Sequence, residues 1–288
     1  MDADVERVAD THCDTGEGPL WHPGEGALYW VDIPNGCLFR YWPDEDDHEL
    51  VFAEHTAQAG FTIEEDGSLA LFRARGLVEG YDGGDRETLV NEIDRERASR
   101  FNDAIADPEG RVFAGTMPTA DGPGNLYRFD PDGDYERVVP DVDIANGMGF
   151  TEDLETFYFT ESEEHVIYEY DYDRATGEIS NQRTFVDTSG EAGVPDGMTV
   201  DEEGYVWSAR WNGGCVVRYD PDGEEVGRVD IPAQKVSSVT FGGPDYGTAY
   251  VTTALEGHDR AEEGEGAGAL FAIDAPVSGR PEFRSSLW

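Results

Sequence analysis

Short apolar runs separated by polar turns repeat along the chain in units of four. Most of the third runs, such as residues 37–41 and 166–170, alternate apolar and polar residues, the pattern of a strand with one buried face. The second run of each unit is the clearest, at residues 27–31, 68–72, 111–114, 156–159, 205–207 and 248–251. The fourth runs, such as 49–52 and 184–186, are shorter and more polar, as expected of outer edge strands.

The first runs of the six units set the repeat length. They start at residues 18, 60, 103, 147, 197 and 238, so successive starts lie 41 to 50 residues apart. Four strands with a period in the forties predict an all-β fold, a six-bladed β-propeller with four antiparallel strands per blade. The units cover nearly the whole chain, so residues 1–288 are predicted to form a single β-propeller domain. We expect residues 5–15 to supply an outer strand that closes the ring, and no helix beyond a turn at residues 95–99.

One residue precedes each first run at the same point of the repeat. Glycine begins four of these runs, which allows the innermost backbones to crowd around a central channel. The preceding residue is then expected to face the channel mouth. In chain order these residues are Glu17, Ala59, Asn102, Asn146, Asp196 and Ser237.

Two carboxylates and two carboxamides in register form a set of oxygen donors. Such donors suit Ca²⁺ or Mg²⁺, and also Mn²⁺ or Fe²⁺. The alternative is that they are ordinary turn residues, because Asp and Asn are common in loops. Glu17 argues against that alternative, since glutamate is a poor turn former. Arg100, two residues before Asn102, either reaches the same mouth or pairs with a surface acid.

The charge of the chain disfavours some classes of binding partner and indicates the ionic environment in which the protein works. There are 63 acidic residues against 20 basic ones, a formal net charge of -43, and Lys235 is the single lysine. Such a surface repels nucleic acid and anionic membranes. The acids are dispersed through nearly every loop, which favours a halophilic protein kept soluble in concentrated salt, where self-repulsion is screened.

Several other kinds of site are disfavoured. The cysteines Cys13, Cys37 and Cys215 are far apart and form no CxxC pair, so neither a disulfide framework nor a thiolate metal site is expected. The six histidines form no HxH or HExxH pair, and no GxSxG motif is present. The start of the chain is acidic and no long apolar run occurs, so a cytoplasmic protein is expected.

The sequence resembles the senescence marker protein-30/gluconolactonase family of regucalcin-like six-bladed propellers. The motifs that carry the resemblance run over essentially the full length and are specific as a set. They are Gly16-Glu-Gly-Pro-Leu-Trp21, Arg100-Phe-Asn-Asp103, Ala114-Gly-Thr-Met117, Asn146-Gly-Met148, Pro195-Asp-Gly-Met198 and Trp211-Asn-Gly-Gly214.

The resemblance implies a metal-dependent lactonase that hydrolyses a sugar lactone, such as a glucono- or pentonolactone, in carbohydrate oxidation. It implies one divalent cation (Ca²⁺, Mg²⁺, Mn²⁺, Zn²⁺ or Fe²⁺) held by Glu17, Asn146 and Asp196. It further implies that Arg100 and Asn102 contact the lactone and that Asp196 also acts as the base.

One departure from the family pattern concerns substrate recognition. Some members carry a glutamate after the Gly-Thr-Met motif that holds substrate hydroxyls, whereas the loop at residues 118–124 offers only Asp121. Two alternative functions follow from the fold alone: a related hydrolase of other esters or organophosphates, or a non-catalytic propeller whose metal is structural.

Overall fold

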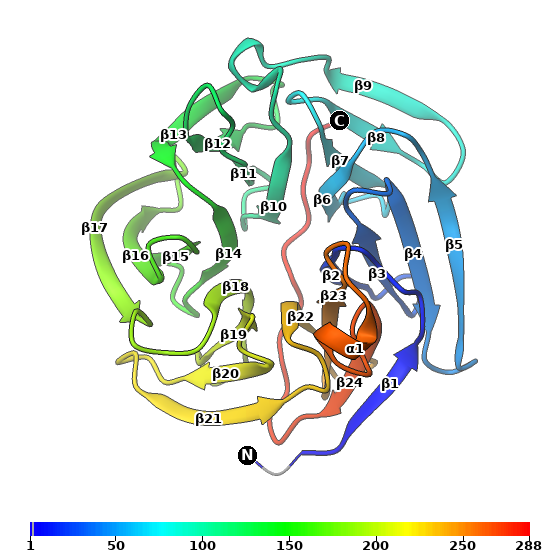
Figure 1. Ribbon diagram of the computed structural model, residues 1–288. Coiled ribbons are helices and arrows are strands. Elements are labelled where there is room, and N and C mark those ends of the chain that lie inside the picture. The colour runs from blue at the N-terminus through cyan, green and yellow to red at the C-terminus, as the bar shows by residue number, and fades with distance from the viewer. Residues whose placement is uncertain (2) are drawn as a thin grey trace.

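The computed structural model describes Met1 and residues 3–288, and within them six four-stranded antiparallel sheets form a ring. Figure 1 shows the sheets arranged as blades around a common centre. The predicted six-bladed propeller is therefore confirmed.

Each blade runs from an inner strand at the channel to an outer strand at the rim. The inner strands are β2 (Gly16–His22), β6 (Gln58–Ile63), β10 (Phe101–Ala106), β14 (Ala145–Phe150), β18 (Val194–Val200) and β22 (Lys235–Gly242). The second strands are β3 (Ala27–Asp32), β7 (Leu69–Arg73), β11 (Val112–Thr116), β15 (Thr156–Glu161), β19 (Val206–Trp211) and β23 (Thr248–Ala254). The third strands are β4 (Cys37–Trp42), β8 (Val78–Tyr81), β12 (Gly124–Phe129), β16 (Val166–Asp173), β20 (Cys215–Tyr219) and β24 (Leu270–Asp274). The outer strands are β5 (Asp47–Ala53), β9 (Arg86–Val90), β13 (Tyr135–Val142), β17 (Glu178–Asp187), β21 (Glu225–Asp230) and β1 (Val5–Ala9).

The ring closes with a strand from the start of the chain, as predicted. Strand β1 pairs antiparallel with β24, with Val5 opposite Ile273. The last blade thus combines the first strand of the chain with three strands from its end, and so has four strands like the other blades.

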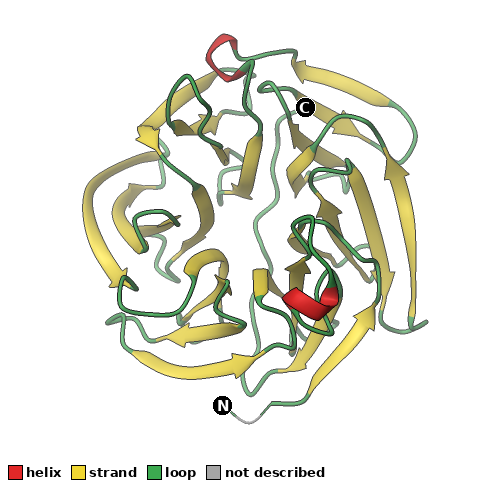
Figure 2. Cartoon of the chain, in the orientation of Figure 1, coloured by secondary structure: helices red, strands yellow, loops and turns green. Residues whose placement is uncertain are grey.

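Two short helical segments occur in the described chain (red in Figure 2). A 3-10 turn, η1 (Asp94–Glu96), overlaps the turn predicted at residues 95–99, and α1 (Arg260–Glu263) lies in a glycine-rich stretch of the last blade, residues 257–268. The helix α1 was not predicted. Four residues are too few to produce a periodic apolar pattern, and the local signal is Asp259, whose side chain caps the helix by accepting from the backbone N–H groups of Ala261 and Glu262. None of the described helices has the length and apolar character needed to span a bilayer.

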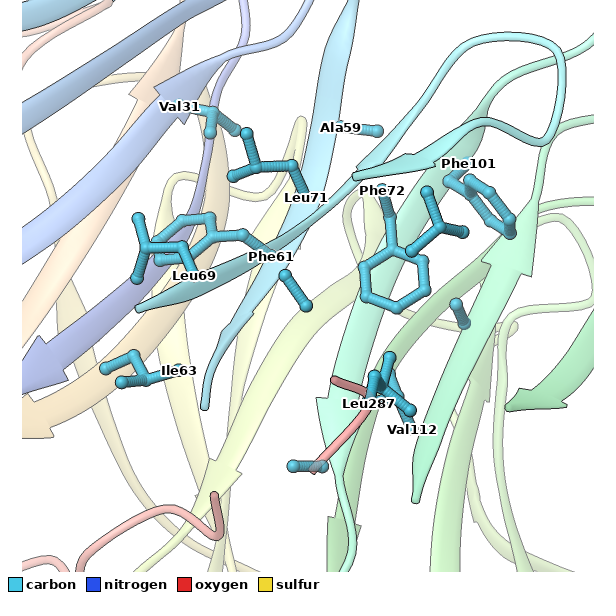
Figure 3. Close-up of a cluster of buried hydrophobic side chains, with 14 of the residues drawn as sticks. Val31, Ala59, Phe61, Ile63, Leu69, Leu71, Phe72, Phe101, Val112 and Leu287 are labelled. Atoms are coloured by element: carbon cyan, nitrogen blue, oxygen red, sulfur yellow. The ribbon is translucent and has the colours of Figure 1, made fainter. Parts of the chain in front are cut away.

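Apolar side chains from neighbouring blades pack together between the sheets. Figure 3 shows one such cluster, in which Val31, Leu71, Phe72 and Phe101 are fully buried. Burial of each such large side chain contributes about 1.5–3 kcal/mol. Alternation within the strands therefore fixes which face of each sheet meets the next blade.

Every inner strand contains a register shift at the position of the channel-mouth residue. The shifts fall between Glu17 and Leu20, between Gln58 and Gly60, between Phe101 and Ala104, between Asn146 and Met148, between Pro195 and Met198, and between Val236 and Ser238. A bulge bends its strand and re-aims a side chain. The repeat thus places a bulge at the same point of every inner strand, where it changes the direction of the channel-mouth side chain.

The segment after β24 crosses the centre of the ring (red in Figure 1). Its Ser285 N–H donates to the carbonyl of Ile63 at 2.9 Å, and its Leu287 N–H donates to the Glu64 carboxylate at 2.7 Å. These contacts lie at the ends of the inner strands. The segment therefore covers the opposite end of the channel from Glu17, an arrangement that the sequence repeat did not predict.

Candidate functional site

The five predicted site residues line one cavity of about 260 Å³ at the mouth of the channel. Glu17 is on β2, Asn102 on β10, Asn146 on β14 and Asp196 on β18, and Arg100 precedes β10. They come from four blades, and the bulges in the inner strands bring them together. The two other residues at this point of the repeat, Ala59 and Ser237, are fully buried and do not line the cavity.

The two carboxylates of the cavity are almost out of contact with solvent. Glu17 is 8% exposed and Asp196 is 4% exposed. Burial, followed by the charge of Asp103, raises the pKa of Glu17 to about 8. Burial, followed by the charges of Glu17 and Asp103, raises the pKa of Asp196 well above its usual range. The acids thus disfavour each other's ionisation, and the charge of Arg100 offsets this only in part.

The donor set fits a divalent cation. The buried Oδ1 of Asp196 has no hydrogen-bond partner among the described residues, an arrangement that costs about 1–3 kcal/mol unless another group satisfies it. A cation between Glu17 and Asp196 would satisfy this oxygen and favour ionisation of both acids. No three His, Cys, Asp or Glu side chains converge as metal ligands in the described chain, so the third ligand here would be the amide oxygen of Asn146.

A chain of hydrogen bonds joins the polar residues of the cavity. Arg100 Nη1 donates to Asn102 Oδ1 at 2.7 Å, and Asn102 Nδ2 donates to Asn146 Oδ1 at 2.9 Å. Asn146 Nδ2 donates to Ser162 Oγ at 3.0 Å, and Ser162 Oγ donates to the Pro195 carbonyl at 2.7 Å. Because each amide nitrogen is already used as a donor, the orientation of both amides is fixed.

This network also defines what Asn102 and Arg100 offer a ligand. Asn102 Nδ2 donates to the Ala145 carbonyl at 3.0 Å as well as to Asn146, so its N–H groups are used within the protein. Its Oδ1 keeps one lone pair. Burial lowers the pKa of Arg100 to about 10, while the charges of Glu17 and Asp196 oppose this change. Arg100 is therefore still cationic at neutral pH and lines the cavity.

Several residues around the site were missed by the sequence reasoning. Ser162 lies just after β15, and only its fully buried position between two inner strands reveals its role. Ser237 donates to the Gly16 carbonyl at 2.5 Å and so holds the strand that carries Glu17. Trp211 and Glu163 line the cavity from neighbouring blades. The repeat that identified the inner-strand residues gives no information about residues at the ends of the second strands. Only Trp211 had a sequence signal, because it begins one of the motifs shared with the family.

A smaller cavity of about 60 Å³ lies in the channel and is lined by both Asp103 and Glu282. Burial, with a contribution from Glu282, raises the pKa of Asp103 to about 6. Glu282 belongs to the segment that crosses the ring, and its Oε1 accepts a hydrogen bond from the Thr199 hydroxyl at 2.9 Å. Acidic groups therefore extend from the mouth into the channel.

Comparisons with known proteins agree with this fold. Residues 15–255 match the sequence family described as the SMP-30/Gluconolactonase/LRE-like region. The chain is 51% identical to pentonolactonase XacC of Haloferax volcanii over 98% of both chains, and 32% identical to regucalcin of Bos taurus over 97% of both. Among solved structures, a luciferin-regenerating enzyme superposes with a TM-score of 0.91 at 28% identity, covering 99% of this chain and 100% of the other. A calcium-binding protein, regucalcin, from Agrobacterium tumefaciens superposes with a TM-score of 0.90 at 26% identity, covering 98% of this chain and 97% of the other.

Proposed function

Because the chain belongs to the SMP-30/gluconolactonase/LRE-like family, we propose that it hydrolyses a sugar lactone to the corresponding aldonic acid with the help of one divalent cation. The observation that carries the proposal is the buried pair Glu17 and Asp196, with an unpartnered carboxylate oxygen directed at no other described group. The pentonolactonase of Haloferax volcanii supports the reaction class.

Glu17, Asn146 and Asp196 would hold the cation through their side-chain oxygens. The bound cation would act as a Lewis acid that polarises the lactone carbonyl. Oxygen ligands favour Ca²⁺, Mg²⁺ or Mn²⁺, and the calcium-binding relative supports Ca²⁺ among them.

Asp196 is the proposed general base. Its carboxylate would take a proton from a water molecule as the water oxygen bonds to the lactone carbonyl carbon. The acyl carbon–ring oxygen bond then breaks, and the proton passes from Asp196 to the departing ring oxygen. The product is the hydroxy acid, and Asp196 is returned to its starting state.

Arg100 and Asn102 would orient the lactone. The guanidinium supplies N–H donors to a substrate oxygen, and the remaining lone pair of Asn102 Oδ1 accepts from a hydroxyl. The bond from Arg100 to Asn102 and the bond from Asn102 to Asn146 tie this contact to the cation ligands. A correctly placed lactone is thus aligned with Asp196.

The protein is further proposed to work in a salt-rich cytoplasm. A net charge of -43 with a single lysine supports this assignment, as does the high identity to a Haloferax protein over the full length. The same charge disfavours nucleic acid and anionic membranes as partners.

Hydrolysis of a lactone panel in concentrated salt tests the function. The panel contains pentono- and hexonolactones, an aryl ester and an organophosphate triester, each measured with and without chelator. We expect hydrolysis of the aldonolactones, lost with chelator and restored by added cation. Preferred turnover of the aryl ester or triester would support the related hydrolase instead. Cation binding without any hydrolysis would support a non-catalytic propeller.

A further inference from the structure

We propose that Glu163 recognises the hydroxyl groups of the lactone that are remote from its carbonyl. This inference rests on the proposed lactone hydrolysis. It states which hydroxyl groups of the substrate the same cavity recognises. Glu163 lines the cavity from the turn that joins β15 to β16, one residue after Ser162.

The turn that carries Glu163 is held on both sides. The Ser162 N–H donates to the Ile144 carbonyl at 3.1 Å. The carboxylate of Glu161, which is buried, accepts from the Ile144 N–H and from the Glu164 N–H, each at 2.7 Å. Glu163 is thus presented on a fixed backbone, which reduces the entropy lost when a ligand binds.

Glu163 is the carboxylate of the cavity that is free to bind a ligand. Four carboxylates line the cavity. Glu17 and Asp196 are assigned to the cation, and Glu256 lies 3.4 Å from the ammonium group of Lys235. The side chain of Glu163 makes no hydrogen bond or ion pair with any described residue, and it is exposed to the cavity mouth.

The loop at residues 118–124, which follows the cavity residue Met117, supplies no carboxylate to the cavity. Asp121, its only acid, is exposed and does not line the cavity. The loop is closed by paired backbone hydrogen bonds between Thr119 and Gly122, at 2.8 and 3.2 Å, so Asp121 sits at the tip of a tight turn.

The chemistry of Glu163 defines the substrate class. An ionised carboxylate only accepts hydrogen bonds, and its two oxygens can accept from two neighbouring hydroxyls. Apolar groups of Met117, Ile144, Val194 and Trp211 complete the cavity wall and can contact the C–H faces of a sugar ring. The cavity therefore favours polyhydroxylated lactones over lactones that lack hydroxyl groups.

A cycle of one protein change and one substrate change tests the inference. Glu163→Gln keeps the size of the side chain and removes its charge. The substrates are an aldonolactone and its deoxy analogue without the remote hydroxyls, and the analogue is measured as a substrate or as a competitive inhibitor. The control is Glu65→Gln, an exposed glutamate that follows the far end of an inner strand.

We expect Glu163→Gln to raise the KM for the aldonolactone about tenfold, the loss of one charged hydrogen bond, with little change in kcat. Removal of the hydroxyls should weaken binding to the wild-type protein similarly and weaken binding to the variant clearly less, because the Gln amide makes only a neutral hydrogen bond to a hydroxyl, while Glu65→Gln behaves like wild type. Equal effects of Glu163→Gln on both substrates, or behaviour like Glu65→Gln, would overturn the inference and leave the lactonase assignment standing. A wild-type protein that hydrolyses no lactone overturns both.

Discussion

The hydroxyl of Ser162 donates a hydrogen bond of 2.7 Å to the carbonyl oxygen of Pro195, the residue that precedes Asp196. The same hydroxyl oxygen accepts from Asn146 Nδ2 at 3.0 Å. Ser162 thus joins one proposed cation ligand to the strand that carries another. It turns the amide of Asn146 so that Oδ1, not Nδ2, is available to a cation, and it acts as a positioning residue.

Ser162→Ala should therefore weaken cation binding more than folding. Loss of a group that orients a metal ligand typically costs about 10–100-fold in affinity. The buried Pro195 carbonyl and Asn146 Nδ2 would lose their partner, at about 1–3 kcal/mol of stability. Titration calorimetry with Ca²⁺ and Mn²⁺ measures the affinity, and thermal melts in chelator measure the fold.

The matched control for this change is Ser180→Ala, an exposed serine on the outer strand β17. It should leave both the affinity and the melting temperature unchanged. Cation affinity in Ser162→Ala equal to that of Ser180→Ala would show that Asn146 needs no such support.

Asp196→Asn should lower the activity of the protein and raise its thermal stability in the absence of a cation. The variant keeps an oxygen ligand but removes the base, so kcat is expected to fall about 10²–10⁴-fold. The wild-type carboxylate is 4% exposed and its pKa is raised by burial and by Glu17, so its ionisation opposes folding when no cation is bound. In chelator at neutral pH the variant should therefore melt at a higher temperature than wild type.

Kinetics on an aldonolactone and melts in chelator check both halves of this prediction, with the exposed Asp222→Asn as control. Hydrolysis close to the wild-type rate would remove Asp196 as the base, even if the cation binds as proposed.

The sequence was sufficient to predict the fold and to identify residues that line one cavity at the channel mouth, whereas their roles remain a proposal. The repeat length of the inner strands supported both predictions, because residues at equivalent positions of a propeller repeat lie at the same end of the channel. Glu17 and Asp196 are far apart in the chain, yet the repeat alone predicted that they meet. Glycine after each of them was a second local signal.

Other features depend on contacts that have no period. Ser162 matters because of what lies beside it, and a serine after a strand is otherwise an ordinary turn residue. The segment that crosses the channel lies outside the repeat, so its Glu282 gave no signal. The one-turn helix α1 is too short for any pattern. Long-range contacts between unrelated segments are thus what the sequence did not reveal.

Salt should stabilise the folded protein. The net charge of -43 makes repulsion the dominant long-range term, since single surface ion pairs contribute only about 0–1 kcal/mol each. The Debye length falls from about 10 Å at 0.1 M to about 3 Å at 1 M salt, which screens that repulsion. We expect the melting temperature to rise across a potassium chloride series, measured in chelator so that cation binding does not contribute. A flat or falling series would contradict the halophile assignment.

Glu282 makes the stability of the channel depend on pH. Its carboxyl accepts from the Thr199 hydroxyl at 2.9 Å, and it contributes to the raised pKa of Asp103 in the same cavity. Burial raises the pKa of Glu282 above its ordinary value of 4.5, and the Thr199 bond and the charge of Arg280 oppose this change. The folded state therefore holds this proton more tightly than the unfolded chain does.

A raised folded pKa on an acid means that stability is lost as pH rises from the unfolded value through the folded one. Below that window both states are protonated and the Glu282 carboxyl does not make stability depend on pH.

Glu282→Gln keeps an acceptor for Thr199 and never ionises, so its stability is not lost in this way as pH rises. At about pH 4 the melting temperatures of Glu282→Gln and wild type should be similar. At about pH 8 the variant should melt at the higher temperature, because ionisation of the wild-type carboxyl there favours the unfolded chain. Titration of Glu17 and Asp196 occurs in both proteins and largely cancels in the difference. Loss of the Glu282 charge also lowers the pKa of Asp103, which adds to the difference in the same direction. The same pair of melts on Glu65→Gln, whose side chain is exposed, should show no growth of the difference with pH. The prediction is contradicted if the difference in melting temperature between Glu282→Gln and wild type stays constant or shrinks toward high pH. That result would mean that Glu282 ionises in the folded protein without loss of stability, and that another group compensates the acidic charge of the channel.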